Sequence, residues 1–111
     1  MKEYGNIDAK KIDNESARAV IARVALGKAD GAPNFCMRVF EIGEGGYTPL
    51  HRHDWEHEIF VHSGEGELFG NCAWHPFRSG MAVLVAPGEE HQIRNSGSGV
   101  LTFVCLVPGT A

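Results

Sequence analysis

Residues 45–64 read GGYTPLHRHDWEHEIFVHSG, and three histidines fall close together in the middle of this stretch. They are His51, His53 and His57, separated by two and four positions. Side chains two residues apart share one side of a β-strand but diverge on an α-helix. The spacing therefore differs from the helical His-Glu-x-x-His zinc signature and places the imidazoles on one side of an extended segment. Imidazole nitrogens are the commonest protein ligands of divalent transition metals, so the stretch predicts a metal site on a strand.

A fourth histidine, His91, follows the turn signal Pro87-Gly88 and is expected to reach the same site from a neighbouring strand. The candidate metal ligands are then His51, His53, His57 and His91. The remaining two histidines, His62 and His75, stand alone in the sequence, and isolated histidines are more often surface or core residues than ligands. We expect neither of them to bind metal.

Composition restricts the class of protein and its partners. A chain of 111 residues suits one domain and leaves no room for a second core. Ten Lys and Arg against fourteen Asp and Glu give a net charge of -4, so no large basic surface for nucleic acid is expected. No apolar run approaches the ~20 residues that span a bilayer, and the first residues lack the apolar core of a secretory signal. We therefore expect a soluble, cytoplasmic protein without nucleic-acid or membrane partners.

Short apolar segments separated by Gly, Pro, Asn and Ser predict an all-β domain. The expected strands are residues 17–26, 35–42, 58–62, 67–69, 74–77, 81–85, a segment beginning at residue 93, and 100–107. The first of them also fits a helical stripe, although its alternation favours a strand. The glycines at 43, 45 and 46 are expected to end the second strand, and residues 58–62 and 67–69 to form a hairpin. The result is a sandwich or barrel, with an N-terminal arm over residues 1–16 and the barrel domain over 17–111.

The last expected strand is apolar on both of its faces. If Phe103, Cys105 and Val107 point inward, Val104 and Leu106 lie on the outer face, and exposed apolar faces are usually covered. A second copy of the chain is the natural cover, which predicts a homodimer.

Two motifs of this chain resemble those of the cupin family. The pattern Gly45-x5-His51-x-His53-x3-His57-x6-Gly64 is similar to the first cupin motif, G-x5-H-x-H-x3,4-E-x6-G. The second motif, G-x5-P-x-G-x2-H-x3-N, is matched by Gly80, Gly88, His91 and Asn95, with Pro87 one place late. Fifteen residues separate Gly64 from Gly80, which is the short spacer of small single-domain bacterial cupins. The chain resembles in particular the four-histidine manganese cupins of thermophiles.

The resemblance implies a cupin double-stranded β-helix, also called a jelly-roll barrel, with the metal inside its mouth. His57 stands where most cupins have a glutamate ligand, and the adjacent Glu58 has the wrong strand parity to replace it. The resemblance implies manganese first and iron second, whereas affinity alone favours copper or zinc, and nickel is also possible. Arg38, Phe103 and Cys105 match positions near the metal in the resembling proteins and are the candidate substrate-pocket residues. Plain core packing is an equal alternative for Phe103 and Cys105, and Arg38 could instead pair with a glutamate.

Four neutral imidazoles leave the full charge on a divalent ion, which makes it a strong acceptor for anionic oxygen ligands. An octahedral ion would keep two adjacent positions open, enough for a chelating substrate or for substrate and dioxygen. The favoured hypothesis is a metal-dependent oxidoreductase, dioxygenase-like, that acts on a small oxygenated compound. The alternatives are a non-oxidative isomerase or decarboxylase and a non-catalytic small-molecule or metal-binding module, since the sequence offers no obvious general base. Because ligation needs neutral imidazoles, whose ordinary pKa is ~6.5, metal should be lost below a pH of about 6.

Overall fold

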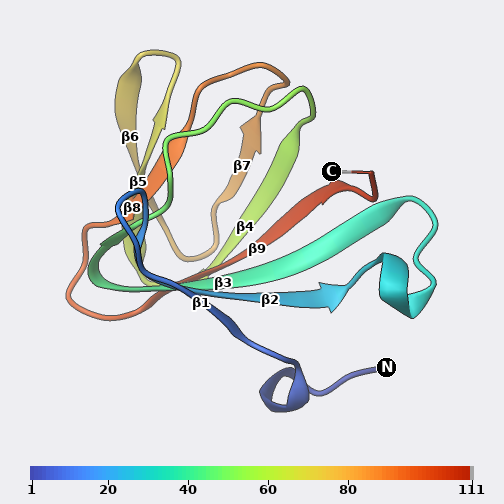
Figure 1. Cartoon of the computed structure of the whole chain (residues 1–111). Helices are drawn as coiled ribbons and strands as arrows, with labels where there is room; N and C mark the ends of the chain where they lie inside the picture. The colour runs from blue at the N-terminus through green and yellow to red at the C-terminus, as the bar shows by residue number, and fades with distance from the viewer. Residues whose placement is uncertain (111) are drawn as a thin grey trace.

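Nine β-strands account for more than half of the residues 1–110 that the computed structural model describes (Figure 1). They are β1 (Lys10–Ile12), β2 (Arg18–Leu26), β3 (Phe35–Tyr47), β4 (His57–Ser63), β5 (Glu65–Gly70), β6 (Ala73–Arg78), β7 (Ala82–Val85), β8 (Gln92–Asn95) and β9 (Leu101–Pro108). Two short 3-10 helices, η1 (Tyr4–Asn6) and η2 (Lys28–Asp30), flank the first strands. The prediction of an all-β domain is confirmed, and each expected strand overlaps one of β2 to β9.

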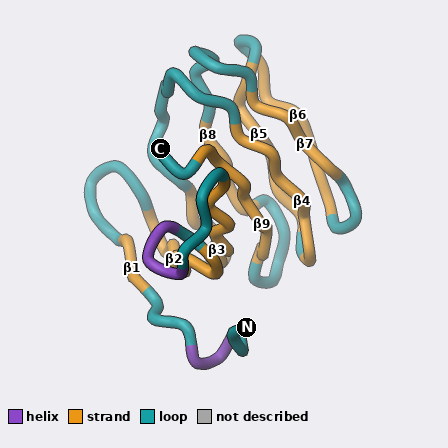
Figure 2. The backbone as a smooth tube through the Cα atoms, turned by 90° about the vertical axis from the view of Figure 1, so that its right-hand side faces the viewer, coloured by secondary structure: helices purple, strands orange, loops and turns teal. Residues whose placement is uncertain are grey.

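All strand pairs within the described residues are antiparallel, and the strands lie in the order β6-β5-β8-β3-β9-β4-β7, with β2 and then β1 beside β3. The sheet curls, so that β5, β6 and β8 face β4 and β9 across the interior (Figures 1 and 2). β3 and β4 follow one another in the chain but are not neighbours in this order, and the same holds for β4 and β5. Such crossings are typical of a jelly roll and exclude a simple meander.

β3 is longer than predicted, because Gly43, Gly45 and Gly46 bend this strand and do not end it. Its first part pairs with β9, whereas Tyr47 at its end pairs with β8 on the other side of the interior. The register with β2 shifts at the same place. Gly45 has a φ of +75°, and a Cβ on Gly46 would lie 2.5 Å from the carbonyl oxygen of Arg18. Glycine is therefore required for the bulge that carries β3 around the barrel.

The predicted hairpin between residues 58–62 and 67–69 is wrong. β4 pairs with β7 and β9, whereas β5 pairs with β6 and β8. Gly64 joins β4 to β5 with a φ of +92°, and a Cβ at this position would lie 2.6 Å from the carbonyl oxygen of Val100. This residue turns the chain across the interior. A sequence pattern cannot separate such a crossing from a tight hairpin, because Ser and Gly mark both.

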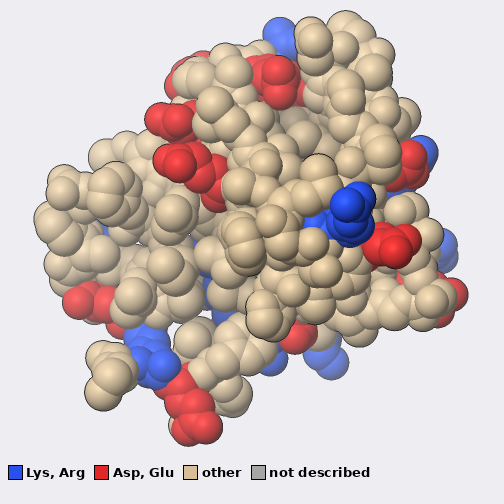
Figure 3. Space-filling view, turned by 180° about the vertical axis from the view of Figure 1, so that it is seen from behind, with Lys and Arg blue, Asp and Glu red and all other residues tan. Residues whose placement is uncertain are grey.

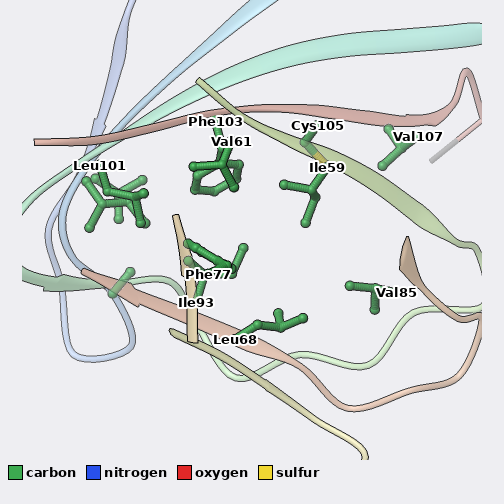
Figure 4. Close-up of a cluster of buried hydrophobic side chains, with 13 residues drawn as sticks. Ile59, Val61, Leu68, Phe77, Val85, Ile93, Leu101, Phe103, Cys105 and Val107 are labelled. Carbon is green, nitrogen blue, oxygen red and sulfur yellow. The ribbon is translucent and has the colours of Figure 1, made fainter. Parts of the chain in front are cut away.

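The core fills the space between the two sides of the curled sheet (Figure 4). Every second residue of β9 is buried, and Figure 4 shows Leu101, Phe103, Cys105 and Val107 on its inner side. Leu68, Phe77 and Ile93 lie across from them on β5, β6 and β8. Burial of apolar surface stabilises a fold by about 25 cal/mol per Å². The burial of Phe103 and Cys105 confirms the prediction that both side chains point inward.

The N-terminal segment is tied to the rest of the chain at three points. β1 pairs with β2, and the ammonium group of Lys2 forms an ion pair with Asp30 at 2.8 Å. The guanidinium of Arg23 donates to the Tyr4 hydroxyl at 2.6 Å and lies over the Tyr4 ring. The division into an arm (1–16) and a barrel (17–111) stays a prediction, and residue 111 lies outside the described residues. No helix within residues 1–110 is long and apolar enough to span a membrane.

Candidate metal centre

The four candidate histidines come from two loops and the start of one strand. His51 and His53 lie between β3 and β4, His57 begins β4, and His91 directly precedes β8. The backbones of His51 and His91 form an isolated antiparallel bridge with N···O distances of 2.9 and 2.8 Å. The amide of Gly88 donates to the carbonyl of His53 at 2.6 Å. These hydrogen bonds hold the two loops together, so that residues far apart in the sequence share one site.

The histidine side chains converge at this bridge. One ring nitrogen from each of His53, His57 and His91 lies within 4.8 Å of the others. His51 lies beside this group, with its Nδ1 3.1 Å from Nε2 of His53. The prediction that His51 and His53 lie on a strand is wrong, because the chain there is a loop crossing between the two sides of the barrel. Their convergence comes from the bridge between loops and not from strand parity.

A hydrogen bond on the far side of the ring sets the tautomer of His91 and guides the assignment for His57. Nδ1 of His91 lies 3.0 Å from the carbonyl oxygen of Glu89, which can only accept, so Nδ1 carries the proton. Nδ1 of His57 lies 3.3 Å from Sγ of Cys105, and we assign it the same donor role. Each ring then presents an unprotonated Nε2, the form in which an imidazole binds metal.

One buried atom shows that these residues fit a metal ion. Nε2 of His57 is buried and has no hydrogen-bond partner among residues 1–110. A buried polar atom without a partner destabilises the fold by roughly 1–3 kcal/mol, so such atoms need an explanation. Ring nitrogens of His53 and His91 lie within 4.8 Å of a ring nitrogen of His57, but neither forms a hydrogen bond with Nε2 of His57. A divalent cation bound by these nitrogens satisfies all of them at once.

Burial favours the neutral form of His51, His53 and His57, because it lowers the pKa of each ring. Desolvation, followed by electrostatic repulsion from His91 and Arg38, lowers the pKa of His57 to about 4. Burial is also the main cause that lowers the pKa of His51 and of His53. Neutral imidazoles are ready to bind metal without losing a proton. These shifts move the expected loss of metal from a pH of about 6 toward more acidic values.

A mostly apolar cavity of about 260 Å³ opens from the histidines into the barrel. The three predicted pocket residues, Arg38, Phe103 and Cys105, all line it. Phe103 stacks on Phe40 with ring centroids 5.3 Å apart, and the Trp55 ring stacks on the imidazole of His53 at 4.6 Å. The volume lies at or below the lower end of the ~300–1,000 Å³ typical of ligand pockets, so the cavity suits a small compound.

Cys105 and Arg38 connect the cavity wall to the histidines. Sγ of Cys105 accepts from Nη2 of Arg38 at 3.7 Å and lies 3.3 Å from Nδ1 of His57, the ring nitrogen to which we assign the proton. Burial raises the pKa of the Cys105 thiol, so the sulfur is uncharged at neutral pH. The thiol therefore orients the ring of His57 without adding a negative charge to the site.

Sequence reasoning missed Phe40 and Trp55. Phe40 lies two residues after Arg38 and shares its face of β3, so strand parity could have found it. No periodicity indicates Trp55, which lies in a loop. Glu58 is exposed on the outer face of β4, as its parity predicts. In the described part of the chain His62 and His75 lie outside the cavity, and His75 donates to the carbonyl of Gly70 at 3.1 Å.

The sequence profile described as "Cupin domain" matches residues 38–107, and the chain belongs to the cupin family. The chain is 30% identical over 71 residues to 1-methylthio-D-xylulose 5-phosphate methylsulfurylase from Rhodospirillum rubrum, covering 64% of this chain and 46% of that protein. It is 31% identical over 68 residues to an oxalate-binding protein from Thermotoga maritima, covering 60% of this chain and 56% of the relative. The chain thus spans about half the length of the curated relatives it matches.

Solved structures share the fold over nearly the whole chain. The polyketide cyclase RemF from Streptomyces resistomycificus superposes with a TM-score of 0.90 and 26% identity, covering 98% of this chain and 78% of that one. A structure described as a predicted oxalate decarboxylase from Thermotoga maritima gives a TM-score of 0.85 at 24% identity and covers 96% of both chains. The predictions of a small cupin and of a jelly-roll fold are confirmed, and the histidine cluster is a possible metal site of the kind cupins have.

Proposed function

We propose that this cupin is a metal-dependent enzyme that binds a divalent transition metal through His51, His53, His57 and His91 and acts on a small oxygenated compound in the adjoining cavity. The observation that carries the proposal is the buried, partnerless Nε2 of His57 in a ring that lies close to two further imidazoles in the wall of an apolar cavity. When bound, the metal supplies Lewis acidity toward an oxygen atom of the substrate. Manganese is our first choice of metal and iron the second.

The residues of the chain prepare the site in three ways. The neutral imidazoles add no negative charge, so they preserve the affinity of the site for anionic oxygen donors. Cys105 holds Nδ1 of His57 and thereby aims its Nε2. The aromatic side chains of Phe40, Trp55 and Phe103 give the cavity an apolar wall, which strengthens electrostatic interactions beside it.

We favour a non-oxidative reaction, such as an isomerisation, cyclisation or decarboxylation of an enolisable carbonyl compound. RemF is described as a cyclase, and it is 26% identical to nearly the whole of this chain. Dioxygenase chemistry, the activity favoured by the sequence, is the second candidate. An apolar cavity beside four neutral imidazoles would admit dioxygen as well as substrate.

Metal analysis followed by an anaerobic assay tests the proposal. We expect about one manganese or iron per chain in the wild type and markedly less in His53→Ala. Zinc- or manganese-loaded protein should then turn over members of a panel of β-keto and 2-oxo acids without oxygen. Turnover only with oxygen and a redox-active metal would select the dioxygenase. The absence of metal under any loading condition, or tight ligand binding without turnover, would contradict an enzyme and leave a binding module.

We also propose that two copies of the chain associate through the outer face of β4, β7 and β9. Phe60 and Leu84 are 50% and 64% exposed on this face, and together with Leu106 they line an open groove of about 480 Å³. Large exposed apolar patches usually mark interaction sites. On the face drawn in Figure 3, Lys and Arg occur singly or in small groups interspersed with Asp and Glu.

A further inference from the structure

The cavity that adjoins the histidines contains a positive charge without a counter-ion. Arg38 projects from β3 into this cavity, where the other polar side chains are histidines, Thr48, Trp55 and Cys105. None of the described residues that line the cavity is Asp or Glu. The wall therefore offers a substrate one cation and no fixed anion.

The contacts of Arg38 leave its charge poorly compensated. Its Nη2 donates to the neutral sulfur of Cys105 at 3.7 Å, and its Cζ lies 5.2 Å from the centroid of the Phe40 ring. Its Nε is buried and has no partner within residues 1–110. Arg38 is half-buried, and a buried guanidinium is usually paired with a carboxylate because an unpaired charge in a low-dielectric site is strongly unfavourable. A thiol and an aromatic ring compensate a guanidinium far less than a carboxylate does.

Acidic residues near the cavity do not supply the missing partner. Asp54 is exposed beside the histidines, and solvent screens its charge. Arg38 also reaches a neighbouring cavity beneath the N-terminal segment, where Asp30 is paired with Lys2. Glu3 and Asp8 line the same cavity. Neither forms an ion pair with Arg38 in the described chain, whereas Arg23 and Arg94 each have a glutamate partner.

We propose that Arg38 selects anionic substrates by binding a carboxylate, while a second oxygen of the same molecule faces the histidines. The inference rests on the proposed function. A divalent ion on the neutral imidazoles adds its charge to that of Arg38, so the cavity attracts an anion and disfavours a neutral molecule of the same shape. The planar guanidinium can hold both oxygens of a carboxylate.

The remaining wall of the cavity defines the rest of the substrate. Phe40, Trp55 and Phe103 surround the space with aromatic rings, and the cavity holds only about 260 Å³. Burial of an apolar group against these rings is favourable. The substrate class is therefore a small 2-oxo or 3-oxo monocarboxylate with an aryl or branched alkyl group.

Calorimetric titration with benzoylformate, its methyl ester and glyoxylate tests this assignment. Manganese-loaded wild type should bind benzoylformate at least about tenfold more tightly than the neutral ester, because the ester loses the charge-assisted hydrogen bonds. It should also bind benzoylformate more tightly than glyoxylate, which lacks the phenyl ring. Arg38→Met should bring the affinities for acid and ester close together with unchanged manganese content, and Arg38→Lys should give an intermediate ratio.

The matched control is Arg78→Met, which removes the same charge from an exposed position on β6. It should retain the wild-type preference for the acid over the ester. An unchanged preference in both Arg38 variants, or a wild type that does not distinguish acid from ester, would overturn the role of Arg38. Circular dichroism identifies a variant that fails to fold, in which case Arg38→Lys decides the question.

The same titration on metal-free protein separates this inference from the proposed function. If the chain takes up no manganese, the metal-dependent function fails. A preference for benzoylformate over the ester that falls in Arg38→Met would still support the arginine subsite. If manganese binds and turnover occurs but Arg38→Met keeps the preference, the proposed function stands and the arginine subsite is rejected.

Discussion

The inner and outer faces of β4 differ in burial and in residue type, although both are formed by the same seven-residue strand. His57, Ile59 and Val61 are buried on the inner face, whereas Glu58 and Phe60 are exposed on the outer one. The adjacent β9 repeats the pattern, with every second residue buried. Because side chains alternate along a strand, one segment builds both the candidate metal site and the proposed interface, and a register shift of one residue would exchange them.

The largest expected difference between the two faces is in the free energy of unfolding after a side chain is truncated. Phe103→Ala is expected to lower the free energy of unfolding by about 3–5 kcal/mol, because Phe103 is buried and stacks on Phe40. Phe60→Ala, on the outer face of the neighbouring strand, should lower it by about 1 kcal/mol or less. Urea denaturation at protein concentrations low enough to keep the chain monomeric measures both values. Equal losses would mean that the outer face is part of the core.

Metal affinity should distinguish adjacent residues of β4. His57→Ala should weaken manganese binding by more than about 100-fold, since even loss of a residue that only orients a ligand weakens binding by 10–100-fold. Glu58→Ala should leave the affinity nearly unchanged, because Glu58 lies on the opposite face. Competition against a chelator of known affinity gives both dissociation constants. Similar effects of the two substitutions would reject His57 as a ligand.

Self-association should depend on the outer face alone. Phe60→Asp places a charge in the proposed interface, and loss of a central aromatic contact typically weakens association by about 2 kcal/mol or more. Sedimentation equilibrium should therefore show a monomer at concentrations where the wild type is dimeric, with metal content preserved. Val100→Asp, at an exposed position before β9, is the control and should stay dimeric. A monomeric wild type would reject the proposed dimer.

Acidification should lower the stability of the fold through His57, which lies on the inner face of β4. In the folded, metal-free protein the pKa of His57 is about 4, below the ordinary value of 6.5. Between these values the unfolded chain binds a proton that the folded chain does not, so stability decreases as the pH falls from about 6.5 toward 4. At pH 5.5 the loss should be on the order of 1 kcal/mol, since one pKa unit corresponds to about 1.4 kcal/mol. His57→Gln should show a smaller loss in thermal denaturation, and an identical pH profile would contradict the assigned shift.

The burial of individual strands could be predicted because alternation is a local property. Residues 58–62 and 100–107 show it directly, and the predicted parity of Glu58, Phe103 and Cys105 agrees with the structure. The path of the chain between strands could not be predicted in the same way. Gly64 and the glycine-rich stretch 43–46 signal a change of direction. Only the tertiary contacts decide whether the chain turns back or crosses the barrel there.

The candidate site was predicted in its composition but not in its construction. The four histidines and the three pocket residues were identified from spacing and resemblance, and all seven line one cavity. The reason given for the convergence of His51 and His53 was wrong, because they lie in a loop fixed by the bridge to His91. Trp55 and the partnerless charge of Arg38 also became visible only in the folded chain.

The sequence by itself therefore determined the all-β class, the cupin motifs and the identity of the candidate ligands, because residue type and strand period are local. Tertiary structure alone decided that β9 lies between β3 and β4, that Cys105 meets the ring of His57, and that the cavity contains Arg38 without an acidic residue among those described. These features depend on contacts between segments far apart in the chain. Their pairing follows from the global burial of apolar surface, which no short stretch of sequence encodes.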